Sequence, residues 1–363
     1  MATVSIAPGV CLREAAFDDF EQIARLERGH DVGRKTFQRW QRLWTENPAF
    51  RRRPGWPIGW VLEHGERIVG SLGNIPVDYE LDGRPIAAAA GRSWVTEPEY
   101  RAYAALLMDE FFQQQGVDLF LSTTVNHKAL DAFGAFEVQR VPSGHWDRSA
   151  FWITNYRGFA RAMARSRGWR IPAWAIAPGL FAKELACGRR LAARSDLGVW
   201  QELAFDERFD DFWQRLRARR RDKLLAVRSR EALEWHYRAA LEQRRLWILT
   251  VLERGRIAAY SIFWRKDSRL HGLKRMRLVD FQSLGDERKT MPAMLAFALQ
   301  LCREEGIDVL EDLGCCMEGI AAPNRRKLAS WTSYYKTEDA ELVERLAQPR
   351  AWRLTLFDGD SSL

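Results

Sequence analysis

Three titratable side chains occupy positions from which they could transfer protons. Glu97 lies near the end of a predicted strand over residues 87–100, and His127 begins the segment after the next predicted strand. Asp280 interrupts an apolar run, "LVDFQ", in a predicted strand over residues 275–284. Carboxylates and imidazoles are common general bases, so all three are candidate catalytic residues. The alternatives are a solvated strand-end carboxylate for Glu97 and a surface or capping histidine for His127.

Further carboxylates fall on predicted buried strands in the second half of the chain. "VLEDLG" places Glu311 and Asp312 on such a strand, as "LVDFQ" places Asp280. A carboxylate is costly to bury unless it is paired or functional. Arg275 and Arg277 are candidate ion-pair partners, so a structural salt bridge and a site for an acceptor amine both remain open.

The stretch "PEYRAYAALLMDEFF", residues 98–112, could bind an anion. It predicts a loop that runs into a helix, with Arg101 at the junction. The first amides of a helix lack intrahelical acceptors, and the helix dipole adds positive potential there. A phosphate-bearing cofactor is therefore a candidate ligand.

The elements that must position these residues alternate along the first half. Periodicity and turn signals predict helices over 16–30 and 35–48, a hairpin over 58–79, a strand over 87–100, a helix over 101–116, a strand over 117–125, and a short helix and strand over 126–138.

From about residue 200 the same order returns. The second half predicts helices over 205–221 and 229–241, a hairpin over 246–264, a strand over 275–284, a helix over 290–306 and a strand over 307–314. Gly116 and Gly306 end matching helices, and an aspartate, Asp118 or Asp308, follows each after one apolar residue. The sequence thus predicts a duplicated α/β domain. The predicted division is an N-terminal domain over 1–145, a basic aromatic-rich linker over 146–199 and a C-terminal domain over 200–363.

This order, with "PEYR" at the end of the fourth strand and "NHKALDAFGAF" after the fifth, resembles the GNAT superfamily of acyl-CoA N-acyltransferases. The resemblance covers residues 10–142 clearly and 200–340 weakly. It implies an α/β (α+β) fold of two tandem GNAT-like domains, each a mixed central sheet flanked by helices, joined by a basic helical linker. It also implies acyl transfer from acetyl-CoA or a longer acyl-CoA, or from an acyl carrier protein, to an amine of a small molecule or of a saccharide or peptide precursor.

The family pattern transfers to this sequence residue by residue. Arg101 matches the start of the phosphate loop, Asn126 and Ala129 match the helix after the fifth strand, and Phe133 falls where the family often has tyrosine. The implied cofactor-binding residues are Val95, Arg101, Ala102, Tyr103, Ala104, Ala105, Asn126 and Phe133.

Two departures weaken the match. Ala104 and Leu106 replace the loop glycines, and Phe133 lacks the hydroxyl of a general acid. Each alanine costs only about one methyl group of access, so the loop could still bind phosphate, with a vestigial loop as the alternative. In the second half, "SLGDERKTMPAML" brings Asp286 and Glu287 beside the phosphates. An active cofactor site is therefore expected in the first half.

Acyl transfer to an amine needs a base, donors for the oxyanion and an acid for the departing thiolate. In the GNAT arrangement the splay between the fourth and fifth strands admits the thioester, so "RSWVTEPEY" would line the reaction path and Glu97 would be the base. Tyr100 and Tyr103 could supply the missing hydroxyl or could pack beside the strand. Tyr334 and Tyr335 lie near the acid position of the second half, with core or rim aromatics as the alternative.

Charge is concentrated between the halves. The chain has a net charge of +8, and residues 148–194 hold ten Arg or Lys against one acidic residue, Glu184, interleaved with aromatic side chains. Such a segment could lie on an anionic membrane, stack on RNA or dock an acidic carrier protein. The alternative is a basic linker that packs its apolar side between the domains.

The remaining composition limits the class of protein. No apolar run reaches the roughly 20 residues of a membrane span, and charge comes too early for a signal peptide, so we predict a cytoplasmic protein, with peripheral contact at the inner membrane surface left open. The five cysteines are expected to be reduced thiols, and no metal site is expected because the six histidines form no close ligand pair.

Three hypotheses follow. The first is a tandem GNAT-like N-acyltransferase. The second is a Fem-type transferase that uses aminoacyl-tRNA, the one case in which nucleic acid would be a partner. The third is a non-catalytic protein whose basic centre docks on a membrane or a partner. A shared fold alone does not decide among them.

Overall fold

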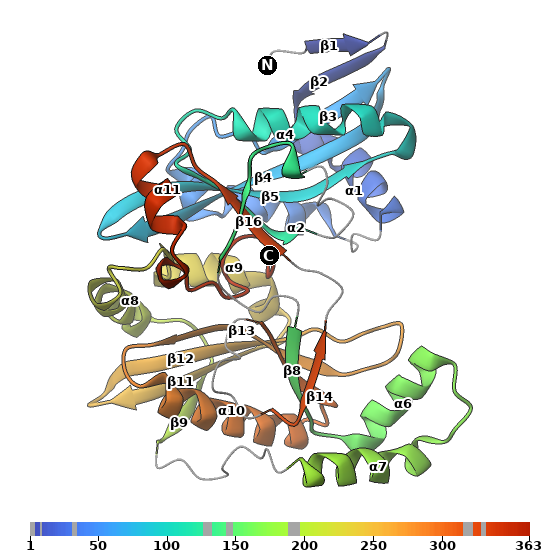
Figure 1. Cartoon of the computed structure of the whole chain (residues 1–363), viewed down its shortest axis with the longest axis vertical. Helices are drawn as coiled ribbons and strands as arrows, with labels where there is room; N and C mark the ends of the chain where they lie inside the picture. Colours follow the sequence, from blue (N-terminus) through green and yellow to red (C-terminus); the bar gives the residue numbers. More distant parts are fainter. Residues whose placement is uncertain are drawn as a thin grey trace.

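The structure is a computed structural model that describes residues 4–7, 9–30, 35–125, 133–142, 148–187, 197–314, 322–327 and 332–363. It contains two mixed sheets, each flanked by helices (Figure 1). In the described residues, no helix is both long and apolar enough to cross a membrane.

The first sheet runs in the order β1-β2-β3-β4-β5-β6-β16-β7, and β10 pairs with β4. Neighbouring strands are antiparallel except β5 and β6, which are parallel. The strands are β1 (Val4–Ala7), β2 (Val10–Glu14), β3 (Gly59–His64), β4 (Arg67–Leu81), β5 (Arg84–Thr96), β6 (Leu119–Val125), β7 (Gln139–Arg140), β10 (Leu225–Ala226) and β16 (Thr332–Lys336).

The second sheet runs in the order β15-β8-β14-β13-β12-β11-β9. Here β13 and β14 form the parallel pair, which corresponds to β5 and β6 in the first sheet. The strands are β8 (Arg148–Ile153), β9 (Val199–Glu202), β11 (Leu246–Glu253), β12 (Arg256–Arg265), β13 (Arg275–Ser283), β14 (Val309–Leu313) and β15 (Asn324–Lys327).

Most helices follow the order expected from the sequence, but those at Pro48–Arg51 and Ala340–Leu346 were not predicted. The helices are α1 (Phe20–Gly29), α2 (Phe37–Thr45), α3 (Pro48–Arg51), α4 (Ala104–Phe112), α6 (Tyr156–Arg167), α7 (Ala173–Ala186), α8 (Glu207–Arg219), α9 (Arg230–Glu242), α10 (Glu287–Glu304) and α11 (Ala340–Leu346), with 3₁₀ turns η1 (Phe17–Asp19), η2 (Pro98–Tyr103) and η3 (Pro349–Ala351). Side chains cap several of them; Thr36 caps α2, Asp206 caps α8 and Ser229 caps α9.

The repeated Gly-x-Asp sequence builds the same corner in both halves. Gly116 and Gly306 have positive φ angles of 74° and 61°, which glycine adopts readily after a helix. The Asp118 carboxylate accepts the backbone N–H of Ala87 at 2.7 Å, and the Asp308 carboxylate accepts that of Lys274 at 2.9 Å. Asp118 therefore links the start of β6 to β5, and Asp308 links the start of β14 to β13. The same hydrogen bond thus recurs in both halves.

The two halves exchange strands. β16, from the end of the chain, lies between β6 and β7 in the first sheet, whereas β8 lies between β14 and β15 in the second. The division at residues 145 and 199 therefore remains a proposal, because β16 and β8 each lie on the far side of it. The segment 146–199 is also more than a linker, because it contributes β8 to the second sheet and carries α6 and α7.

A shared apolar core joins the halves. The helices α8 and α9 lie between the two sheets (Figure 1), and their buried side chains pack in one cluster with Tyr79 and Ile86 of the first sheet and Tyr260 of the second. Because this core contains side chains of both sheets, it holds one face of the first sheet against the second half.

Candidate active site

The strands β5 and β6 separate part-way along the first sheet. They pair only through Ala88–Ala90 with Leu119–Leu121. Beyond that point β5 continues through Gly91–Thr96, paired to β4 on one edge and, in the described residues, to no strand on the other. Alternate peptide groups of an antiparallel strand point to each edge, so some amides of this stretch face the opening without a ladder partner. Such amides can donate to an oxyanion.

A β-bulge turns the backbone at the same place. The pairing with β4 shifts between Ser71 and Gly73, so Ser93 and Trp94 together stand opposite Leu72. Ser93 has a φ of 54°, which is uncommon for a residue other than glycine. Bulges of this kind re-aim side chains and end regular pairing.

The face of the opening toward α4 is aromatic. The Trp94 ring lies 5.7 Å from that of Phe133, which in turn lies 5.5 Å from that of Tyr334 on β16. Trp94 Nε1 donates to the carbonyl oxygen of Ala104 at the start of α4. The strand exchange thus brings a tyrosine from the end of the chain against Phe133, the residue that stands where the GNAT pattern has tyrosine.

The opposite face of the opening is charged. Ala90 packs with α1 and α2, and because strand side chains alternate, Arg92 points to that face as well. Arg92 and Ser93 line a small cavity together with Glu27 and Lys35. Lys35 Nζ lies 2.7 Å from Glu27 Oε1, and Glu27 is only 3% exposed. Burial, then the nearby Arg92, lowers the pKa of Lys35 to about 8.

The last residues of the chain lie against this charged face. Arg92 donates to the backbone oxygens of Asp360 and Leu363, each at 3.2 Å. The hydroxyls of Thr123 and Thr124 on β6 donate to Asp360 Oδ1 at 2.9 and 3.2 Å. The segment therefore bridges the separating strands and narrows the opening.

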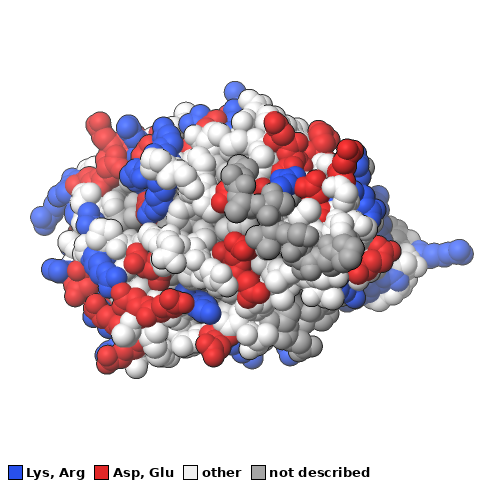
Figure 2. Space-filling view, turned by 90° about the horizontal axis from the view of Figure 1, so that it is seen from above, with Lys and Arg blue, Asp and Glu red and all other residues white. Residues whose placement is uncertain are grey.

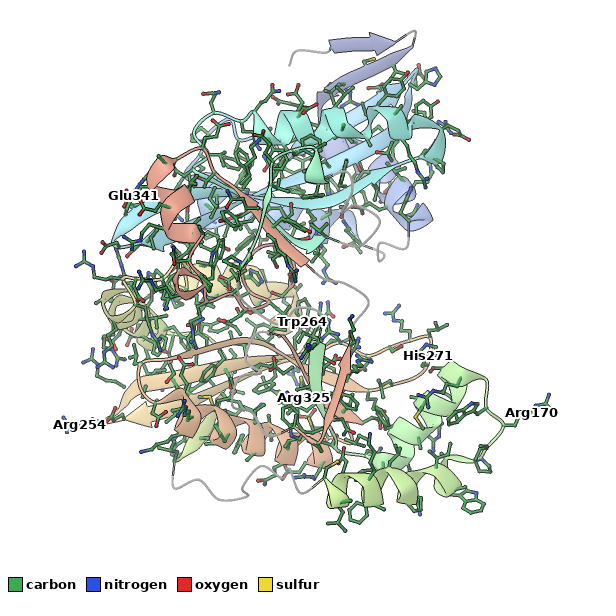
Figure 3. All side chains as sticks on the ribbon, viewed as in Figure 1. Arg170, Arg254, Trp264, His271, Arg325 and Glu341 are labelled. Atoms are coloured by element: carbon green, nitrogen blue, oxygen red, sulfur yellow. The ribbon has the colours of Figure 1, made fainter. Side chains whose placement is uncertain are left out.

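Positive charge from the second sheet approaches the same place. Lys266 Nζ, just after β12, lies 2.9 Å from the centroid of the Trp264 ring, which Figure 3 labels between the two sheets. Burial lowers the pKa of Lys266 to about 6, with further contributions from Arg277, Arg39 and Arg92. Within the described residues, neither Lys266 nor Arg39 has a carboxylate within 4 Å, whereas Arg92 contacts the terminal oxygen of Leu363. Three basic side chains, Arg92, Arg39 and Lys266, thus lie near one another on the charged face of the opening.

The predicted phosphate loop has a different form from the one expected. Residues Pro98–Tyr103 form a 3₁₀ turn, in which the N–H of Ala104 donates to the oxygen of Arg101 and that of Tyr100 to Glu97. These amides are therefore engaged within the turn, whereas the Arg101 side chain is exposed. A pyrophosphate would have to bind through Arg101 or rearrange the turn.

The neighbours of this turn are also fixed. Glu97 Oε2 lies 3.1 Å from Arg67 Nη2, and Tyr100 Oη lies 2.5 Å from His64 Nδ1. Glu97 is thus a half-buried, paired carboxylate at the end of β5. Its catalytic role stays a prediction.

The matching helix start in the second half is covered by its own carboxylates. Asp286 caps α10 by accepting the N–H of Arg288, and Glu287 Oε1 lies 2.7 Å from both Arg220 Nη2 and Arg353 Nη1. An anion would have to displace these carboxylates. The geometry thus favours the first half for any phosphate-bearing ligand.

Asp280 is a structural carboxylate. It is 0% exposed; its Oδ2 lies 3.1 Å from Arg228 Nε and accepts the Tyr260 hydroxyl at 2.9 Å. Arg228 also contacts Asp358 at 3.0 Å. Although burial alone would raise it, the pKa of Asp280 is held below its ordinary value by Arg228. The expected role of Asp280 in catalysis does not fit this placement, and its partner is Arg228, whereas Arg275 and Arg277 pair with Glu311.

The remaining predicted residues divide into three groups. Val95 is buried in the core and Phe133 lies in the aromatic row, whereas Ala102 and Ala105 are exposed on the turn and first residues of α4, with Tyr103 and Ala104 half-buried between them. Asn126, His127 and Ala129 lie outside the described residues. Where residues are described, no cluster of three His, Cys, Asp or Glu forms a metal site, and the expectation of no metal stays a prediction.

Sequence reasoning did not identify the charged residues beside the opening, which are the pair Glu27 and Lys35 and the arginine Arg92. Glu27 and Lys35 come from α1 and the segment before α2, far from β5 in sequence, and no local motif marks them. Arg92 carried a usable signal, because it is a charged residue directly after the alanine-rich run of a predicted strand.

Comparison with family models and with curated protein sequences finds no match for this chain. Solved structures do match. Saccharomyces cerevisiae N-myristoyltransferase with bound myristoyl-CoA aligns with a TM-score of 0.56 at 12% identity, covering 92% of this chain and 83% of that one. A GCN5-related N-acetyltransferase from Kribbella flavida aligns with a TM-score of 0.55 at 13% identity, covering 91% of this chain and 71% of that one.

A second GCN5-related N-acetyltransferase, from Anabaena variabilis, aligns with a TM-score of 0.53 at 11% identity and covers 90% of this chain and 72% of that one. At these identities the likeness concerns the fold. Each sheet has one parallel pair, β5–β6 or β13–β14, beside a strand from another part of the chain, β16 or β8. The chain therefore has the tandem GNAT fold predicted from its sequence.

Proposed function

We propose that the chain is an N-acyltransferase that moves an acyl group from acyl-CoA to an amine at the opening between β5 and β6. One observation carries the proposal: the two strands separate after Ala90 at a bulge, within the fold shared with solved N-acyltransferases. The opening has an aromatic face and a charged face, which suits a donor and an acceptor that arrive from opposite sides.

The donor side is the aromatic row of Trp94, Phe133 and Tyr334. An acyl thioester lying along these rings would place its carbonyl at those amides of Gly91–Thr96 that face the opening and do not pair with β4. These amides would stabilise the oxyanion. The exposed Arg101 would contact the phosphates. Val95 and residues 101–105 are retained as the proposed surroundings of the cofactor.

The acceptor side is the charged face, where Arg92, Arg39 and Lys266 lie near one another. An anionic ligand would offset the charge of the arginines and would favour the protonated form of Lys266, which is mostly neutral near pH 7. We therefore assign the acceptor to amines that also bear an acidic group. Such a ligand would raise the low pKa of Lys266 toward its ordinary value, so binding near pH 7 should take up a proton.

The chemistry needs three proton transfers. Glu27 would accept a proton from the acceptor ammonium, and the free amine would then attack the thioester carbon to give a tetrahedral oxyanion. The attacking nitrogen, positively charged in this intermediate, loses its second proton to solvent, from which the Tyr334 hydroxyl is later restored. Collapse then breaks the carbon–sulfur bond and leaves the neutral amide. The Tyr334 hydroxyl would protonate the departing thiolate, and Lys35 would orient Glu27.

A second donor is favoured by the turn before α4. Because the amides of Tyr100 and Ala104 donate within the turn, they are not available to a pyrophosphate. An acyl carrier protein presents the same pantetheine thioester without the adenosine diphosphate part. The same acyl chain should therefore be offered on both carriers.

The test is thiol release from acetyl-CoA, palmitoyl-CoA and the matching acyl carrier proteins, with acidic amines and their neutral amide analogues. The proposal expects turnover that requires both substrates, a lower KM for acidic amines, and proton uptake by calorimetry in buffers of different ionisation enthalpy. If Arg92→Gln no longer has a lower KM for acidic amines than for their neutral analogues, the acceptor binds at the charged face. Absence of turnover and of any thermal stabilisation with every donor would overturn the proposal.

A further inference from the structure

The helices α6 and α7 form a hairpin that projects from the second half, away from the rest of the molecule (Figure 1). Gly168 ends α6 in the left-handed conformation with a φ of 64°, and Pro172 precedes α7. The inner side is made of small residues, because Ala160, Ala164 and Ala177 are buried. The hairpin is thus a packed structural unit with a free outer surface.

The outer surface of α7 carries an apolar stripe. Trp174, Pro178, Phe181 and Leu185 are spaced at i, i+4, i+7 and i+11, which places them on one face of a helix. Trp174 is 69% exposed, Phe181 48% and Leu185 51%. The turn before α7 adds the exposed Trp169 and Ile171. Exposed apolar surface of this extent marks a contact site.

The rest of the hairpin is basic. Residues 148–187 contain six Arg, one Lys and one Glu, a net charge of +6, so the other residues of the chain contribute only +2 of the total of +8. The exposed arginines are Arg157, Arg161, Arg165, Arg167 and Arg170, and in the described part of the chain none has a carboxylate within 4 Å. Figure 3 labels Arg170 at the tip, and the projection extends beyond the rest of the outline in Figure 2, ending in Lys or Arg side chains.

The single acidic residue of the hairpin is turned inward. Glu184 accepts the Tyr156 hydroxyl at 2.6 Å and contacts Asn324 of β15. It therefore does not neutralise the outer surface. By contrast, the face shown in Figure 2 carries acidic and basic side chains interspersed.

We propose that the α6–α7 hairpin docks the protein on an anionic bilayer, with the stripe Trp174–Leu185 in the interfacial region and the arginines at the lipid head groups. An apolar stripe beside basic residues is the pattern of a helix that lies in the membrane interface, where tryptophan is also favoured. RNA fits less well, because leucine, isoleucine and proline give no surface on which bases stack. An acidic carrier protein fits less well, because the exposed stripe itself is apolar. This inference is independent of the proposed acyl transfer.

The experiment is vesicle cosedimentation of the full chain, with phosphatidylcholine alone and with added phosphatidylglycerol, at low and high salt. Binding should be on the order of tenfold or more tighter to the anionic vesicles and should weaken with salt, because several basic residues contribute. Tryptophan emission should shift to the blue only with anionic vesicles.

Two variants make the test specific. Trp174→Ser/Phe181→Ser/Leu185→Ser should lose the binding, whereas the control Leu203→Ser/Leu270→Ser, at positions 93% and 85% exposed, should keep it. All five positions are exposed, but the Phe181 ring also lies 5.4 Å from that of Tyr156 on α6, so circular dichroism must first show that both variants are folded. The proposal is overturned if the stripe variant binds vesicles as the wild type does, if neutral vesicles bind equally, or if the protein retains RNA or an acidic carrier protein but no vesicles.

Discussion

The parallel pair β5–β6 and its duplicate β13–β14 share a topology but differ in what surrounds them. β13 also carries a bulge, at Val279, since its pairing with β12 passes from Asp280 directly to Leu278. In the first sheet the bulge faces an opening lined by Arg92, Glu27 and Lys35. In the second it faces a closed core in which Arg228 fixes Asp280.

This difference indicates that the two copies of the duplicated fold have different roles, with ligand binding in the first half and stability in the second. The fold places a bulge and a parallel pair in each half, but side chains decide whether the place can admit a ligand. In the second half both carboxylates, Asp280 and Glu311, are paired with arginines. The helix α10 carries Asp286 and Glu287 at its start, where a phosphate would otherwise bind. Substitutions around the first pair should therefore change activity, and substitutions around the second should change stability.

The largest effect is expected at Glu27. Glu27→Gln keeps the shape but cannot accept the ammonium proton, so kcat/KM should fall by about 10² to 10⁴. Lys35 can become neutral beside it, since its pKa is already about 8, so the protein should stay folded. The exposed Glu253→Gln is the control. Activity within threefold of the wild type in Glu27→Gln would remove Glu27 from the mechanism.

The corresponding substitution in the second half is Arg228→Met. It leaves Asp280 and Asp358 buried without their cation, which should lower the free energy of unfolding by about 3–5 kcal/mol. Urea denaturation measures the loss, with the exposed Arg303→Met as the control. Adding Asp280→Asn should recover part of it, because one uncompensated charge disappears. An unchanged unfolding midpoint in Arg228→Met would show that the cluster is not the structural element described above.

A smaller effect is expected at Tyr334. Tyr334→Phe removes the proposed proton donor, but a thiolate is a moderately good leaving group because thiols ionise near pH 8.5, so kcat should fall only roughly tenfold. Tyr335→Phe, on the next residue of β16, is the matched control because its hydroxyl donates to Gln139 on the other face. Equal losses in the two variants would argue for a packing role of both tyrosines.

The smallest effect concerns pH. His236 is buried beside the Ser362 hydroxyl, 2.6 Å from Nε2, and burial lowers its pKa from 6.5 to about 3. Between these values the unfolded chain binds a proton that the native protein does not, so stability should fall as pH drops below 6.5. The slope contributed is up to about 1.4 kcal/mol per pH unit. His236→Gln should make the urea midpoint depend less on pH between pH 4 and 6.5. His271→Gln should leave this pH dependence as it is in the wild type.

Much of the fold was predictable because its signals are local. Hydrophobic periodicity and the Gly116 and Gly306 stops predicted the strands β3–β6 and β11–β14 and the helices around them, and the repeated Asp118 and Asp308 predicted the duplication. The strands β1 and β2 and the helix α11 were not predicted. The exchange of β8 and β16 was not predictable in this way, because a strand's sequence does not specify which sheet edge it will join.

The candidate site was predicted less well for a related reason. The motif residues near Arg101 mark the correct helix start, but the 3₁₀ turn that engages its amides depends on tertiary packing around Glu97 and Tyr100. Arg228, Glu27 and Tyr334 are brought to their partners from distant parts of the chain. Their contacts arise only once the sheets and the shared core have formed.

The measurement that tests the central claim most directly is photolabelling with an acyl-CoA that carries a diazirine on its acyl chain, followed by peptide mapping. The account predicts labels on the peptides of β5, of Phe133 and of β16, with label on β16 despite its origin at the end of the chain. Labels confined to β13, β14 or α10 would contradict it, because the acyl group would then react in the half that this account assigns to stability.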